Sequence, residues 1–129
     1  RFPRLQMLRL PDLPSGDIAA GRAFARFLQK DIDPARIAGL YNVGSGSAGL
    51  ARALEAAGLA GKVPMAAHDL TDEHRTLLSD GSFAYLLTQD IHYCVGVAAR
   101  VLRALCENVR GALNVVQPRV EILTSENLQ

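Results

Sequence analysis

Asn42, Asp69 and Gln89 share one context, because each follows a short apolar run and precedes a helical pattern. If the three runs are neighbouring parallel strands, their carboxyl ends meet at one rim of an open α/β sheet, where such sheets bind ligands. Two amides and a carboxylate can together accept and donate hydrogen bonds to vicinal hydroxyls. The pattern predicts a site for a sugar or another polyhydroxylated molecule, although each residue alone is also a common turn former or helix cap.

The elements that must position these side chains alternate along the chain as in βα units. We expect strands at residues 5–10, 37–41, 63–67, 83–88 and 119–123. We expect four helices: one capped by Ser15, one after the glycine-rich turn at 44–49, one capped by Thr71 or Asp72, and one running from Asp90 to Gly111. Strands separated by such helices imply an α/β fold with a mostly parallel, doubly wound sheet that carries helices on both faces.

Apolar residues at helical spacing predict the buried face of each helix. These positions are Ala20, Phe24, Phe27 and Leu28 in the first helix; Leu50, Ala53, Leu54 and Ala57 in the second; Leu77 and Leu78 in the third; and Val95, Ala98, Val101, Leu102, Leu105 and Val109 in the fourth. With 129 residues, of which 49% are apolar, the chain is one domain's worth and can bury a substantial core.

Composition limits the possible partners. The 14 Lys plus Arg residues nearly balance the 13 Asp plus Glu residues and form no basic run, so the chain itself has no nucleic-acid surface. The longest apolar runs are well short of the roughly 20 residues that span a bilayer, which predicts a soluble protein without membrane contact. The first residues include neither an initiator methionine nor a signal-peptide pattern, so we expect the natural chain to start upstream.

Cys94 and Cys106 lie twelve positions apart on the last predicted helix, which separates them by about 18 Å along its axis. They cannot form a disulfide with each other while that helix is intact. Two free thiols favour a reducing, cytoplasmic setting. A metal site that combines these cysteines with His92 is rejected, because the two cysteines point about 120° apart around the helix.

The glycines at 44, 46 and 49 match the GxGxxG pattern of dinucleotide-binding proteins, and Asp69 stands at a suitable distance to bind a ribose hydroxyl. Against nucleotide binding, this unit is not the first of its sheet, and the chain has no room for a second mononucleotide-binding half. Ser45 and Ser47 lack the spacing of a nucleophile elbow, so hydrolase chemistry has no support. His74 is expected on a polar helix face as an ordinary surface residue.

Four segments in order carry a family resemblance: residues 40–49, 67–74, 80–90 and 119–128. The chain resembles the effector-binding domain of lac-repressor (LacI) family transcriptional regulators and their relatives, the type I periplasmic sugar-binding proteins. The closing Ser-Glu-Asn-Leu at 125–128 is typical of the regulators. The resemblance implies the C-terminal portion of a two-lobed domain, with the second lobe at roughly 1–89, a helix at 90–110 that returns to the first lobe, and a closing strand at 119–123. The first lobe and the helix-turn-helix head have no counterpart in the sequence.

By the same resemblance, Asn42, Asp69 and Gln89 match ligand contacts of the second lobe and hinge, in a cleft between the lobes. His68 stands where the sugar-binding proteins often have an aromatic residue, and it is a further candidate ligand contact. Val43 stands where many have an aspartate after the asparagine. Because His68 and Val43 differ from the residues usual in the family, the identity of the ligand is left open.

The expected function follows from the resemblance. The chain is interpreted as the ligand-sensing part of a bacterial regulator, not an enzyme, without cofactor or metal. A sugar-like effector would control operator DNA binding by the missing head. A homodimer is expected through the helices at 47–57 and 72–78, with Leu50, Leu54 and Leu77 as candidates for both the core and the contact. The alternatives are a periplasmic solute-binding protein of a sugar ABC transporter and, third, a fragment of a nucleotide-dependent enzyme.

Overall fold

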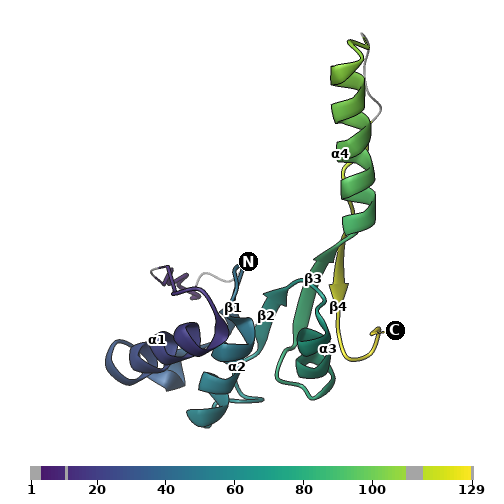
Figure 1. Cartoon of the computed structure of the whole chain (residues 1–129). Coiled ribbons are helices and arrows are strands. Elements are labelled where there is room, and N and C mark those ends of the chain that lie inside the picture. Colours follow the sequence, from purple (N-terminus) through teal and green to yellow (C-terminus); the bar gives the residue numbers. More distant parts are fainter. Residues whose placement is uncertain (1–3, 11, 110–114, 129) are drawn as a thin grey trace.

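The computed structural model describes residues 4–10, 12–109 and 115–128. Its elements follow one another as α1 (Asp17–Lys30), the 3₁₀ turn η1 (Pro34–Arg36), β1 (Leu40–Tyr41), α2 (Ser47–Ala56), β2 (Met65–His68), α3 (Asp72–Ser79), β3 (Tyr85–Gln89), α4 (Ile91–Cys106) and β4 (Val120–Leu123). Figure 1 shows this alternation of helices and strands along the chain. The predicted α/β class is therefore confirmed.

The strands form one four-stranded sheet whose order, β1-β2-β3-β4, follows the chain. β1 pairs with β2 and β2 with β3 in parallel, whereas β4 returns antiparallel to β3. The mostly parallel sheet expected from the βα periodicity is confirmed. Its topology brings the carboxyl ends of β1, β2 and β3 to one rim, because adjacent parallel strands run in the same direction.

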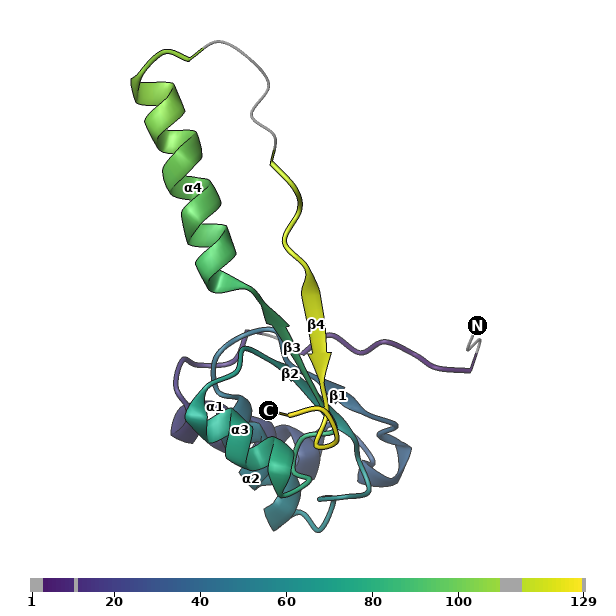
Figure 2. The ribbon, with the colours of Figure 1, turned by 90° about the vertical axis from the view of Figure 1, so that its right-hand side faces the viewer.

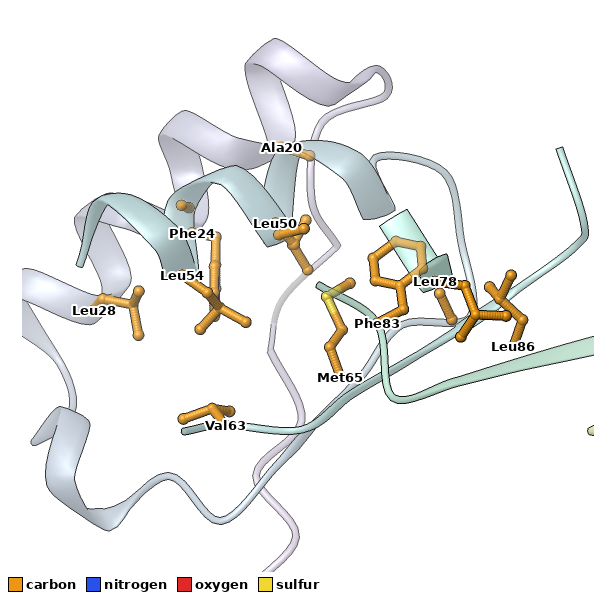
Figure 3. Close-up of a cluster of buried hydrophobic side chains, with 13 residues drawn as sticks. Ala20, Phe24, Leu28, Leu50, Leu54, Val63, Met65, Leu78, Phe83 and Leu86 are labelled. Atoms are coloured by element: carbon orange, nitrogen blue, oxygen red, sulfur yellow. The ribbon is translucent and has the colours of Figure 1, made fainter. Parts of the chain in front are cut away.

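The core lies between this sheet and the helices α1, α2 and α3. Met65 and Ala67 of β2 and Leu86 of β3 point to the helical side and are fully buried. They meet buried residues from all three helices and from the segments before the strands, namely Ala20, Phe24, Leu28, Leu50, Ala51, Ala53, Leu54, Val63, Leu78 and Phe83. Figure 3 shows most of these side chains filling the space between strands and helices. The helix stripes predicted for α1, α2 and α3 thus account for about half of the core, although Ala57, predicted to face inward, is exposed.

The opposite face of the sheet is bare within the described residues. Tyr41, Tyr85 and Ile122 lie on this face and are 52%, 49% and 58% exposed. In Figure 2, α1, α2 and α3 gather on one side of the strands. The expectation of helices on both faces is therefore not met by the described residues. The βα alternation in the sequence predicts helices beside the sheet, but it does not show whether helices of this chain cover both faces.

Helix α4 extends away from the sheet, as Figures 1 and 2 show. Its apolar stripe was predicted to be buried, but Val95, Leu102 and Leu105 are 62%, 62% and 67% exposed. The prediction is wrong for these residues. The covered face of α4 is another one, where the Tyr93 hydroxyl donates to the carbonyl oxygen of Val116 at 2.8 Å and Ala104 is buried. The helix ends at Cys106, earlier than predicted, and the expected terminator Gly111 lies outside the described residues.

The N-terminal expectations also need correction. Residues 5–10 form no strand, and Met7 is 95% exposed, because no described strand lies beside this segment to pair with it. Helix α1 is not capped by Ser15. Its N-cap is Gly16, whose φ of 88° suits a glycine and whose position offers no side-chain cap.

Two of the three residues predicted at the dimer contact are buried in the core. Leu50 and Leu54 are 1% and 2% exposed, so they serve the core and cannot also form a dimer contact, while Leu77 is half-buried. The homodimer itself stays a prediction. Across residues 4–10, 12–109 and 115–128, no helix is both long and apolar enough to cross a membrane.

Candidate functional site

The rim at the carboxyl ends of β1, β2 and β3 carries the three polar residues expected there. Asn42 directly follows β1, Asp69 directly follows β2, and Gln89 is the last residue of β3. Because β2 lies between β1 and β3, Asp69 occupies the centre of the row. The predicted positions at one rim are confirmed. No hydrogen bond joins one of these side chains to another, so each is held by its own strand end.

Asp69 has the features of a binding residue most clearly. Its φ is 66°, a left-handed backbone conformation, and its N–H donates to the carbonyl oxygen of Leu87 at 2.9 Å. Its carboxylate is exposed and has no hydrogen-bond or ion-pair partner among the described residues. It does not cap α3, because the hydroxyl of Thr71 accepts the bond from the N–H of His74. The backbone is thus fixed while both carboxylate oxygens are available.

Asn42 has a structural task. Its Nδ2 donates to the carbonyl oxygen of Gly44 and to the hydroxyl oxygen of Ser47, both at 2.8 Å, and more weakly to the carbonyl oxygen of Ser45 at 3.4 Å. Ser47 is only 1% exposed. The side-chain nitrogen therefore ties the glycine-rich turn to the end of β1. The side-chain oxygen has no partner among the described residues and can accept from a ligand.

We expect Asn42→Ala to lower the free energy of unfolding by about 2 kcal/mol, because the buried Ser47 hydroxyl and the turn carbonyl lose their donor. Urea unfolding of the complete protein measures this loss. Gln89→Ala is the matched amide control and should stay within about 0.5 kcal/mol of the unmodified protein, since the Gln89 side chain has no described partner. Equal losses of unfolding free energy in Asn42→Ala and Gln89→Ala would contradict the structural role given to Asn42.

Gln89 ends β3 opposite Val120 of β4 and is exposed. It does not cap the following helix, because the carboxylate of Asp90 accepts the N–H of Tyr93 at 2.9 Å. Neither Asp69 nor Gln89 is therefore a helix cap, because Thr71 caps α3 and Asp90 caps α4. Their side chains remain available at the rim.

His68 lies one residue before Asp69, on the bare face of the sheet. Its Nε2 is 2.7 Å from the hydroxyl of Tyr41, and the two rings are tilted by 49° with centroids 5.5 Å apart. Tyr41 was not among the residues predicted for the site. Its place beside Ala66 in the register, next to His68, could have indicated the pair once the strands were aligned. A ligand that bound His68 through Nε2 would have to displace this contact.

The glycine-rich turn does not present a free anion site. The first amides of a helix bind phosphate in dinucleotide-binding proteins. Here the N–H of Gly49 donates to the carboxylate of Asp17 at 3.2 Å, and Ser47 and Ala48 are 1% and 0% exposed. A phosphate at this place would meet a carboxylate and the packed end of α1. Gly46 and Gly49 instead allow α1 to lie close against the start of α2, which argues against nucleotide binding.

A hollow of about 260 Å³ lies beside α1 and is lined by residues such as Leu13, Arg26 and Phe27. It does not reach the rim. Within the described ranges, no three His, Cys, Asp or Glu side chains gather in a way that could hold a metal ion. Cys94 and Cys106 are both free thiols. The rim is therefore the best-defined candidate site of the described chain, and it is open on one side.

Comparison with known families adds one match over most of the chain. Residues 17–109 match the sequence model of the family described as periplasmic binding protein domain. Comparison with curated protein sequences gives no significant match.

Several solved structures share the fold. GanP, a glucose-galactose binding protein from Geobacillus stearothermophilus, aligns with a TM-score of 0.75 at 15% identity, over 88% of this chain and 39% of that chain. A solute-binding protein of an ABC transporter from Agrobacterium vitis, with bound D-fucose, aligns with a TM-score of 0.69 at 19% identity. The alignment covers 84% of this chain and 37% of that chain. A carbohydrate transporter solute-binding protein from Agrobacterium radiobacter, in complex with D-arabinose, aligns with a TM-score of 0.70 at 18% identity. The alignment covers 86% of this chain and 37% of that chain.

These identities show a shared fold and no more. The chain spans about two fifths of the length of the solved structures that it matches.

Proposed function

Because this chain belongs to the periplasmic binding protein domain family, we propose that its rim forms one wall of a cleft that binds a sugar or sugar derivative. Asn42, Asp69 and Gln89 contact hydroxyls of the ligand, and His68 lies beside them. The chain acts by binding, without a covalent step. The opposite wall comes from parts of the fold that this chain does not span.

One observation carries the proposal. The Asp69 carboxylate stands at the centre of the rim, exposed, held in a left-handed backbone conformation and without a partner among the described residues. Two carboxylate oxygens can accept hydrogen bonds from two vicinal hydroxyls at once, and such charge-assisted bonds are among the stronger ones in proteins. The acceptor oxygen of Asn42 and the amide of Gln89 flank it on the neighbouring strands. This combination suits a polyhydroxylated ring better than an anion or an apolar molecule.

The solved structures support the ligand class. Two of them hold a monosaccharide, D-fucose in one and D-arabinose in the other, and a third is described as a glucose-galactose binding protein. Those ligands belong to those proteins. They define the set of compounds with which a search for the ligand of this chain should start.

Calorimetric titration and thermal unfolding of the complete protein with a panel of aldoses test the proposal. The panel includes D-fucose, D-arabinose, D-galactose and D-glucose, with glycerol and NAD as controls. A bound sugar at one hundred times its Kd should stabilise the fold by about 2.7 kcal/mol, which raises Tm by a few degrees. If no sugar of a wide panel binds while NAD does, the nucleotide alternative replaces the sugar site.

We further propose that the chain belongs to a cytoplasmic transcriptional regulator whose head binds operator DNA as a homodimer. The free thiols of Cys94 and Cys106 suit a reducing compartment, and the Ser-Glu-Asn-Leu at 125–128 resembles the regulators. A ligand that prefers one relative orientation of the lobes is sufficient to change DNA binding at a distance.

A solute-binding protein of a sugar transporter is the second candidate, supported by the descriptions of two similar structures. The complete protein distinguishes the two candidates. A helix-turn-helix head and a DNA mobility shift that responds to sugar support the regulator. A signal peptide and no DNA binding support the transport protein. The rim site is common to both.

A further inference from the structure

His74 makes contacts that its place in the sequence does not suggest. It lies in the first turn of α3, where it was expected as an ordinary surface residue, but its side chain is half-buried. The ring meets the edge of the Phe83 ring, with centroids 5.3 Å apart and planes at 73°. The imidazole is therefore held from one side by the core, which limits where its nitrogens can point.

The Nδ1 of His74 contacts two backbone carbonyl oxygens just before the helix. It lies 2.8 Å from the oxygen of Asp69 and 3.1 Å from that of His68. A carbonyl oxygen accepts and never donates, so Nδ1 must carry the proton in both contacts. The hydrogen-bonding partners thereby assign the tautomer of a neutral His74 ring.

These bonds are not needed to cap α3. Thr71 is the N-cap, and its hydroxyl already accepts the backbone N–H of His74 at 3.1 Å. In a capping box the side chain at this position accepts a bond from the N-cap N–H. Here the side chain donates, and its targets are the carbonyl oxygens of His68 and Asp69, which flank the Cα of Asp69. The ring therefore ties the end of β2 to the start of α3.

We propose that His74 is a positioning residue for the ligand-binding carboxylate of Asp69. A left-handed conformation is uncommon for a residue other than glycine, so contacts from neighbouring residues help to hold Asp69 in it. The N–H of Asp69 donates to Leu87. Its carbonyl oxygen accepts from the His74 ring at 2.8 Å and, over a longer 3.3 Å, from the N–H of Thr71, so that both peptide groups around its Cα are held. With the backbone fixed, the Cα–Cβ bond of Asp69 leaves the rim in one direction, and the carboxylate is confined to the few staggered rotamers about that bond. The effect on ligand binding rests on the proposed sugar site, whereas the tautomer and the geometry do not.

The first experiment needs no ligand. Long-range ¹H–¹⁵N correlation spectra of the complete protein, assigned with His74→Asn, report which ring nitrogen carries the proton near neutral or mildly alkaline pH. We expect a protonated Nδ1 and an unprotonated Nε2, the reverse of the tautomer preferred by free imidazole side chains in water. A His74 ring protonated at Nε2 alone would overturn the proposal, whatever the ligand proves to be.

The second experiment compares two variants with the sugar found in the panel. In His74→Asn the side-chain amide places an N–H near the position of Nδ1–H, whereas His74→Leu retains apolar contact with Phe83 and removes the donor. We expect His74→Asn to bind within about threefold of the unmodified protein and His74→Leu to bind about tenfold more weakly. Equal losses in both variants would overturn the role of the donor.

A double-mutant cycle with Asp69→Asn then separates positioning from general stability. If His74 acts through the Asp69 carboxylate, His74→Leu should cause little further loss of affinity once that charge is absent. A loss that is equal in both backgrounds would mean that His74 only stabilises the fold. If no sugar binds the unmodified protein, the proposed function fails, while the tautomer experiment still decides whether His74 holds the turn.

Discussion

Asp69→Asn in the complete protein should lower sugar affinity at least tenfold, about 1.4 kcal/mol or more of binding free energy, and leave the fold unchanged. Asparagine matches the size of aspartate and tolerates a left-handed backbone, so the φ of 66° is retained. What is lost is the charge and one of two acceptor oxygens facing the ligand hydroxyls. Calorimetric titration measures the affinity, and thermal unfolding without ligand checks the fold.

Two further substitutions at Asp69 separate its side chain from its backbone. Asp69→Gly removes the carboxylate without left-handed strain, so affinity falls and stability changes little. Asp69→Ala should lose the same affinity and in addition about 1 kcal/mol of stability, because alanine is strained at this φ. Glu55→Gln, a change at an exposed carboxylate on α2, is the control and should bind normally. Full affinity in Asp69→Asn would remove the central member of the proposed site.

Gly49→Ala should destabilise the fold by about 3 kcal/mol, although alanine is the better helix former by about 1 kcal/mol. A Cβ at Gly49 would overlap the carbonyl oxygen of Asp17, so the backbones of α1 and α2 would have to move apart. The expected sign is thus opposite to that of helix propensity. The midpoint of urea unfolding measures it.

Gly44→Ala is the matched control for this substitution. It lies in the same glycine-rich turn, but a Cβ there meets nothing within 4 Å. We expect a change within about 0.5 kcal/mol. A Gly49→Ala variant more stable than the unmodified protein would contradict the close contact between α1 and α2, and with it the argument that Asp17 covers the N-terminus of α2.

The row of candidate residues could be predicted because the information is local. A run of apolar residues followed by a polar residue and a helical pattern marks the end of a strand, and parallel order follows from the helices between strands. Thr71 and Asp90 were expected at helix starts because a cap bonds an amide two or three residues away. The same local logic explains why Asn42, Asp69 and Gln89 meet at one rim.

Other features depend on residues far apart in the chain. The glycines of the turn fit a nucleotide-binding pattern equally well until α1 is seen to lie against them, with Asp17 contacting Gly49 across 32 positions. The stripe of α4 predicts burial because apolar residues recur at helical spacing. That spacing does not show whether another part of the chain lies against the stripe. Pairing of Tyr41 with His68 required the register of β1 on β2.

His74 shows the boundary between these two kinds of information. The sequence by itself determined the carboxyl ends of the three parallel strands, the starts of α3 and α4, and the residue types at the rim, since these arise from hydrogen bonds and periodicity within a few positions. Only the tertiary structure decided which of these polar groups are already bonded and which are available. Phe83 packs the His74 ring so that Nδ1 faces the turn, and that contact arises because β3 returns beside β2. The Asp69 carboxylate remains available because its neighbours, not Asp69 itself, supply the bonds that the turn and the helix require.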